Sequence, residues 1–98
     1  MTNYVLAFRG RPDRHAAPDA DAAWGTWFTR LGDTVVDFGH RVGQVRTVAA
    51  DGGGQDSNVL TGYVVINAAN IDTAAELAGG CPGLAHGVSV EVAEAVDA

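Results

Sequence analysis

The sequence predicts an α+β domain with the element order β-α-β-β-α-β, in which two helices cover one antiparallel sheet. Three observations predict this fold. Four short segments are rich in β-branched and aromatic residues, as strands are. Two other segments carry apolar residues at helical spacing. Glycine, proline and aspartate separate these segments from one another, as they do at turns. With 98 residues, the chain predicts a single domain over residues 1–98.

The first half of the chain predicts a strand, a long helix and a second strand. The segment "NYVLAFR" predicts a strand over 3–9. Asp19 is the expected N-cap of a helix that continues to Phe38 and ends at Gly39. Apolar residues recur along it at three- and four-residue spacing: Trp24, Trp27, Phe28, Leu31, Val35 and Phe38. The segment "GQVRTVAA" then predicts a strand over 43–50.

The second half predicts a loop, a strand, a short helix and a last strand. Glycines and turn formers predict a loop over 51–58, and "TGYVVINA" predicts a strand over 61–68. Asp72 is the expected cap of a short helix that ends at Gly79. In "GVSVEVAEAV", valine alternates with Ser, Glu and Ala, which predicts a half-buried strand over 87–96.

This order of elements is the ferredoxin-like split βαβ arrangement, with the antiparallel strands ordered 4-1-3-2 and both helices on one face. The other face is then bare. Its apolar candidates, depending on register, are Tyr4, Leu6, Phe8, Tyr63 and Val65. Because such a surface is unfavourable in water, we expect a homodimer that buries it.

The topology also brings three loops to the same end of the sheet. These are the loop after the first strand, the glycine-rich loop and the loop before the last strand. Candidate polar residues at this rim are Arg9, Arg11, Arg14, His15, Asp51, Asp56, Cys81 and His86. Asp37 and His40 are expected at the opposite end. Loops on a rigid scaffold often carry function, so the rim is the expected site.

The main candidate site at the rim combines an arginine, a histidine and a hydroxyl. The last strand is the antiparallel neighbour of the first, so Arg9 is expected near His86 and Ser89. Arg9 would bind a small organic anion and His86 would transfer a proton. The alternative is that His86 only forms a hydrogen bond to the glycine-rich loop and holds it in place.

Three further residues have both a functional and a structural interpretation. Arg11 belongs to a short basic run that either binds an anion or is simply solvated. Trp24 either lines a ligand pocket or packs in the core. Cys81 follows the C-terminal end of a helix, where the helix dipole disfavours a thiolate, so we interpret it as structural.

Composition excludes several classes of function. Six arginines, no lysine and twelve acidic residues give a net charge of −6. This charge argues against nucleic acid and anionic membranes as partners. No membrane span, signal peptide, metal-ligand spacing or cofactor motif is expected, and the protein is predicted to be cytoplasmic. The residue usage suggests a GC-rich bacterial genome.

The chain resembles the YCII-related proteins, which include the DGPF-domain group, in three stretches: "YVLAFRG", "WGTWFTRLGDTVVDFG" and "DGGGQDSNVLTGYVVINAANIDTAAELAGGCPGLAHGVSVEVAEAV". The resemblance implies a dimeric α/β barrel of two ferredoxin-like subunits. A distant branch of the family removes chloride from a chlorinated aromatic, and the bacterial prototype carries a proposed histidine–aspartate pair. Asp33 and Asp37 are present here, but the first helix contains no histidine, so this pair is not carried over.

Two hypotheses of function therefore remain open. The first is an enzyme-like pocket at the rim that acts on a small aromatic or anionic molecule. The second is a non-catalytic dimeric module that binds a small ligand or a partner protein. The residues at the rim favour the first, and the missing helix histidine favours the second.

Overall fold

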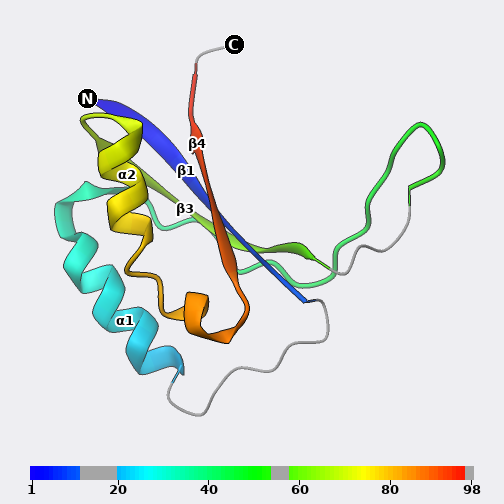
Figure 1. Cartoon of the computed structure of the whole chain (residues 1–98), viewed down its shortest axis with the longest axis horizontal. Coiled ribbons are helices and arrows are strands. Elements are labelled where there is room, and N and C mark those ends of the chain that lie inside the picture. Colours follow the sequence, from blue (N-terminus) through cyan, green and yellow to red (C-terminus); the bar gives the residue numbers. More distant parts are fainter. Residues whose placement is uncertain (12–19, 54–57, 97–98) are drawn as a thin grey trace.

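The structure, a computed structural model, describes residues 1–11, 20–53 and 58–96 of the chain. The expected cap Asp19 and the rim candidates Arg14, His15 and Asp56 lie outside these residues. The elements, drawn in Figure 1, are β1 (Thr2–Gly10), α1 (Ala20–Leu31), the 3₁₀ turn η1 (Gly32–Thr34), β2 (Val35–Asp37), β3 (Val59–Ala68), α2 (Ile71–Ala78), the 3₁₀ turn η2 (Pro82–His86) and β4 (Ser89–Glu94).

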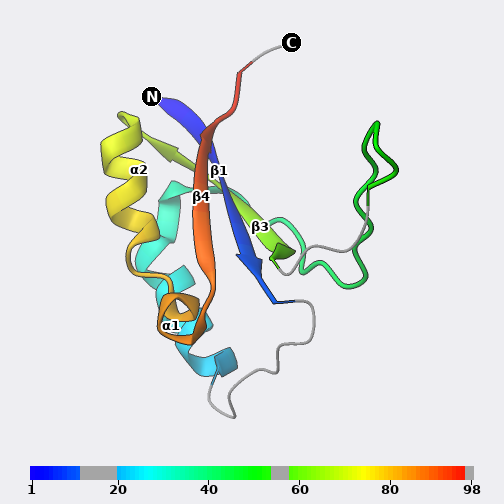
Figure 2. The same cartoon turned by 45° about the vertical axis from the view of Figure 1, so that its right-hand side comes forward.

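The four strands form one sheet in the order β2-β3-β1-β4, and every neighbouring pair is antiparallel. Both helices lie against the same face of this sheet (Figure 2). A small α+β fold with a four-stranded antiparallel sheet and two helices is thus confirmed. β1 and β3 are the central strands, and β2 and β4 form the two edges.

The two faces of the sheet follow from the alternation of side chains along each strand. The covered face, against the helices, consists of Tyr4, Leu6, Phe8, Val64, Ile66, Val90 and Val92, all buried or half-buried. The open face consists of Val5, Ala7, Arg9, Tyr63, Val65, Ser89, Glu91 and Ala93. The prediction of Tyr4, Leu6 and Phe8 on the bare face is therefore wrong, because the even-numbered residues of β1 point toward the helices. Tyr63 and Val65 do lie on the open face.

Aromatic side chains join the helices to the covered face. The ring of Trp27 is buried, and its Nε1–H donates to the backbone oxygen of Leu77 in α2 at 3.1 Å. A buried indole needs such an acceptor, so this bond ties α1 to α2. Phe8 packs edge-on against Trp24 and Trp27, with ring centroids 5.0 and 5.8 Å apart.

The first helix is much shorter than predicted. Gly32 adopts a left-handed φ of 53°, and the Thr34 hydroxyl donates to the Leu31 carbonyl at 2.7 Å, so the helix ends at Leu31. Val35 then pairs with Ile66 as part of β2. The helical spacing was misleading because Val35 packs against the same core from a strand.

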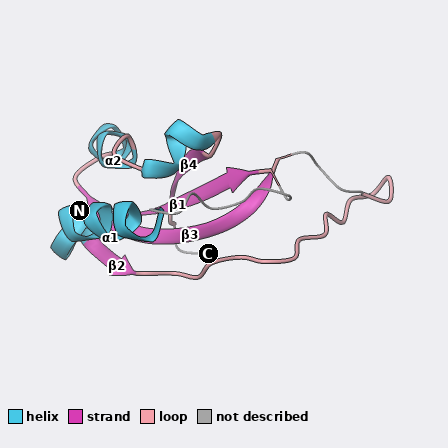
Figure 3. Ribbon diagram, turned by 90° about the horizontal axis from the view of Figure 1, so that it is seen from below, coloured by secondary structure: helices cyan, strands magenta, loops and turns pink. Residues whose placement is uncertain are grey.

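The predicted second strand over 43–50 was also wrong, since the second strand is Val35–Asp37. After a turn at Gly39, the chain continues beside β3, where Arg41 bridges Gly62 and the Val42 N–H donates to Thr61 O. Residues 43–53, which we call the arm, extend beyond the sheet and belong to none of its four strands (Figure 3). The radius of gyration of 14.1 Å exceeds the ~13 Å typical of 100 residues, in agreement with a projecting arm.

The other predicted elements are present with small shifts at their ends. The third strand starts at Val59 rather than at residue 61, and the last strand covers Ser89–Glu94. The cap of α2 is Asn70, whose side-chain oxygen accepts the Thr73 N–H at 2.8 Å, and not Asp72. Asp72 instead lies in the first turn of α2, where a carboxylate favours the helix dipole.

Candidate functional site

Arg9 and Ser89 are direct cross-strand neighbours on the open face, as the sequence predicts from the pairing of the first and last strands. The register of β1 against β3 shifts between Phe8 and Arg9, which makes a β-bulge at this point. A bulge of this kind often redirects a side chain next to a functional site. The Thr61 hydroxyl stabilises the bulge by donating to the Phe8 carbonyl at 3.1 Å.

The Arg9 guanidinium has few partners. Its only hydrogen bond to a described residue is a long one, 3.4 Å, from Nη2 to the backbone oxygen of Asn58. No carboxylate of the described residues forms an ion pair with it. Arg9 is half-buried, so its aliphatic part lies along the sheet while its charged end remains available.

His86 lies apart from Arg9 and Ser89. It is the last residue of η2, is exposed, and precedes Gly87, whose left-handed φ of 84° turns the chain into β4. η2 packs on α1: a Cβ placed on Gly83 would lie 3.2 Å from the Trp24 ring. His86 therefore belongs to the helix layer, whereas Arg9 and Ser89 belong to the opposite face of the sheet. No contact between described residues brings His86 together with Arg9 and Ser89.

The remaining sequence candidates have structural surroundings. Trp24 is half-buried against Phe8 and Trp27, with a centroid distance of 5.7 Å to Trp27. Arg11 is exposed directly after β1. Cys81 is buried, and burial is the main cause that raises the pKa of its thiol, although backbone N–H groups of the following turn oppose the shift. A buried thiol of raised pKa agrees with the structural interpretation of Cys81.

His40 does not lie at the end of the sheet where the sequence predicts it. Its carbonyl accepts the Tyr63 N–H at 3.2 Å, and its ring lies 6.0 Å from the Tyr63 ring. His40 therefore borders the middle of β3. The turn at Gly39, which the Asp37 carboxylate stabilises by accepting the Gly39 N–H at 2.8 Å, carries the chain there. Asp37 itself pairs with Val65, also in the middle of β3.

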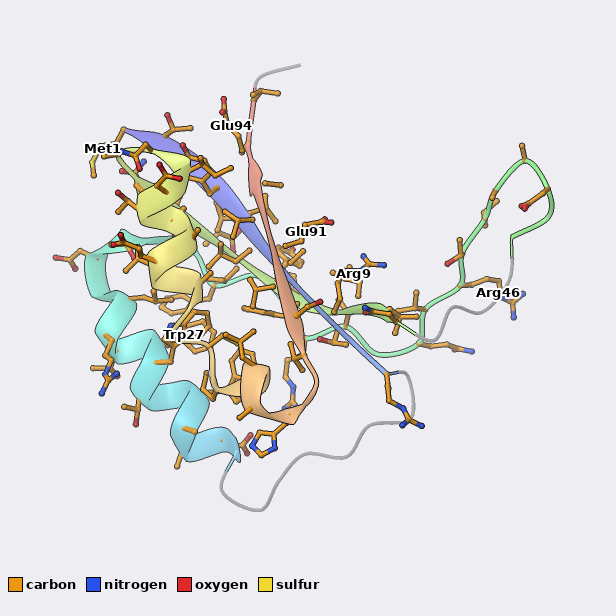
Figure 4. The ribbon with its side chains drawn as sticks, viewed as in Figure 1. Met1, Arg9, Trp27, Arg46, Glu91 and Glu94 are labelled. Atoms are coloured by element: carbon orange, nitrogen blue, oxygen red, sulfur yellow. The ribbon has the colours of Figure 1, made fainter. Side chains whose placement is uncertain are left out.

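Sequence reasoning missed Glu91 as a residue of interest. Glu91 pairs with Ala7, one step along the strand from the Arg9–Ser89 pair, and lies on the open face. Figure 4 shows Arg9 and Glu91 directed away from the helices and Glu94 on the other side of β4. The alternation of "VSVEV" is the signal that could have identified it, because it places Ser89 and Glu91 on one face.

Comparisons of this chain with protein-family models, with curated proteins and with solved structures found no match. Within 1–11, 20–53 and 58–96, no three His, Cys, Asp or Glu residues gather closely enough to hold a metal ion. None of the helices in that part of the chain has the length and apolar character needed to cross a membrane.

Proposed function

We propose that this protein is a non-catalytic homodimeric module, in which two copies associate through their open sheet faces. The observation that carries the proposal is the open face itself. Both helices pack on the covered face, while Val5, Ala7, Val65 and Ala93 remain half-buried or exposed on the other. A contiguous apolar surface of this kind typically marks a site of protein association.

The resemblance to YCII-related proteins supports the same arrangement. We interpret the sheet order as that of a ferredoxin-like subunit, and two such subunits with their open faces together would form a dimeric α/β barrel in a bacterial cytoplasm. A non-catalytic role is favoured over an enzyme because His86 and Arg9 belong to opposite layers. No hydrogen bond in the described part of the chain links the Arg9 guanidinium to the His86 ring.

Analytical ultracentrifugation at micromolar concentration tests the dimer. We expect a species of twice the 10.1 kDa mass of the chain. Val65→Glu, which places a charge on the open face, should yield a folded monomer. Ala75→Glu, an equivalent change at an exposed position of α2, is the control and should leave the dimer intact. A monomeric wild-type protein would refute the proposal.

A second candidate function is a small-molecule enzyme, favoured by the observed pairing of Arg9 with Ser89. In this alternative, Arg9 holds an organic anion at the rim and His86 transfers a proton. Titration with benzoate, a small aromatic anion, tests it by NMR. Saturable shifts of both the Ser89 amide and the His86 ring would support the enzyme, and shifts of neither would exclude benzoate-like substrates.

A further inference from the structure

The open face carries one cation and one anion side by side. Arg9 pairs with Ser89 and Ala7 pairs with Glu91, so Arg9 and Glu91 are diagonal neighbours on adjacent strands. Diagonal neighbours on one face of a sheet are about 7–8 Å apart, within reach of long side chains. Yet no ion pair joins Arg9 to Glu91, and the Glu91 carboxylate makes no hydrogen bond to any residue in the described part of the chain.

Two such charges would conflict with burial of the open face. Burying an unpaired guanidinium or carboxylate is costly, whereas a charge that is paired and hydrogen-bonded can be accommodated. The long bond from Arg9 to the Asn58 carbonyl leaves most of the five guanidinium N–H donors without an acceptor among the described residues. If two open faces meet, Arg9 and Glu91 therefore each need a partner from the other copy.

Two-fold symmetry supplies both partners at once. In an isologous interface, if residue i contacts residue j of the partner, then j contacts i of the partner. A two-fold axis that lies between the packed sheets, perpendicular to the line from Arg9 to Glu91 and through its midpoint in projection, places each guanidinium opposite the partner's carboxylate. Facing sheets are separated by about 10 Å, a gap that an arginine and a glutamate can span together.

We propose that Arg9 of each copy forms an ion pair with Glu91 of the other copy, so that two symmetric pairs set the register of the homodimer. This inference rests on the dimer proposed above. Only one axis between the sheets satisfies both pairs, so the charges select one arrangement among the many that apolar contacts alone would allow. Arginine suits this role because its planar fork binds a carboxylate with two parallel hydrogen bonds.

Charge reversal tests the pairing. Arg9→Glu and Glu91→Arg each place two repulsive contacts in the homodimer, and each should weaken dimerisation by on the order of 100-fold. An equimolar mixture of the two variants should form a heterodimer, because both contacts across its interface are again Glu opposite Arg. The double variant Arg9→Glu/Glu91→Arg should regain the homodimer. Sedimentation measures the dimerisation of the two single variants, of their mixture and of the double variant, with a fluorescent label on one variant to detect the heterodimer.

The mixture is the decisive sample. If the two residues paired within one chain, the double variant would recover and the mixture would not, which would overturn the inference. Glu94→Arg is the matched control, because Glu94 is an exposed glutamate of the same strand but lies opposite Tyr4 of the covered face. It should leave the dimer unchanged.

Circular dichroism is the measurement that checks whether each variant is folded. Should a reversal unfold the chain, Arg9→Gln and Glu91→Gln replace it, with the expectation of about 10-fold weaker dimers that lose sensitivity to salt. A wild-type dimer that tolerates all these changes refutes the ion pair and leaves the dimer standing. A monomeric wild-type protein refutes both.

Discussion

The covered face and the open face of the sheet are made by alternate residues of the same strands, but a single chain completes only one of them. On the covered face, Leu6 and Val64 are fully buried beneath the helices. On the open face, Val5 stays half-buried and is interspersed with the charges of Arg9 and Glu91. The covered face therefore forms the core of the chain, whereas the open face is the surface on which the proposed dimer depends.

The largest expected effect comes from shortening an apolar side chain to alanine on the covered face, compared with the same change on the open face. Leu6→Ala, at 0 % exposure, should lower the free energy of unfolding by about 2–5 kcal/mol because it leaves a cavity. Val5→Ala should cost less than about 1 kcal/mol in dilute protein, and more as concentration rises and the dimer forms. Urea unfolding at two protein concentrations measures both. Equal costs in dilute protein would show that one chain already packs both faces.

A second test concerns how tightly the helix layer is packed. A Cβ on Gly83 would lie 2.9 Å from the Val88 Cβ and 3.2 Å from the Trp24 ring. Gly83→Ala should therefore destabilise the fold by about 1–3 kcal/mol through overpacking, and Val88→Gly, which removes both the Cβ and the Cγ2 that lies 3.1 Å away, should relieve the clash. Gly25→Ala is the control: nothing lies within 4 Å of its Cβ, so it should stabilise α1 by about 0.5–1 kcal/mol. Equal melting temperatures for Gly83→Ala and Gly25→Ala would contradict the close packing of η2 against α1.

A third test compares thiol access on the two faces. Cys81 is buried, so iodoacetamide should modify it far more slowly than it modifies a free cysteine at neutral pH. In the variant Cys81→Ala/Ala93→Cys, the thiol lies on the open face and should react fast in dilute protein. At high concentration, dimerisation should protect it. Mass spectrometry measures both rates, and equal reactivity at all concentrations would argue against the dimer interface.

The smallest effect is the pH dependence that Cys81 contributes. Burial raises the pKa of its thiol above the ordinary value of 9.0, so the unfolded chain loses this proton first. The stabilisation is complete below pH 9.0 and is lost as the pH rises through the pKa of the folded state. Stability measured above pH 9 should fall less steeply in Cys81→Ala than in the wild-type protein.

How much could be predicted from the sequence differs along the chain. β1, β3, α2 and β4 each carry a pattern that agrees with their surroundings, and their ends were predicted to within a few residues. The segment 35–50 misled in two ways. Val35 and Phe38 kept helical spacing although the helix ends before Gly32, and "GQVRTVAA" has strand composition although it is part of none of the four strands of the sheet. Strand propensity reflects packing against neighbours, which the sequence of one segment does not contain.

The candidate site shows the same limit. The proximity of Arg9 and Ser89 follows from strand order, since antiparallel neighbours fix the residues that face each other. The separation of His86 from Arg9 depends on how η2 packs against α1, and no local pattern determines that contact. The alternation in the last strand predicts that Glu91 is on the exposed side. Its proximity to the charge of Arg9 follows only from the pairing of two strands that are distant in the sequence.

The two edges of the sheet also bear on aggregation. Exposed strand edges are templates on which further chains can add and grow into fibrils. β2 is only three residues long, and beyond it the chain bends at Gly39, where the backbone approaches the Tyr63 carbonyl so closely that a Cβ would overlap it. β4 carries two glutamates, Glu91 and Glu94, whose charges repel a second copy of the same strand. Growth from edge to edge is therefore disfavoured on both sides, which leaves the open face for the proposed association, and two copies joined face to face would form a closed pair instead of an open polymer.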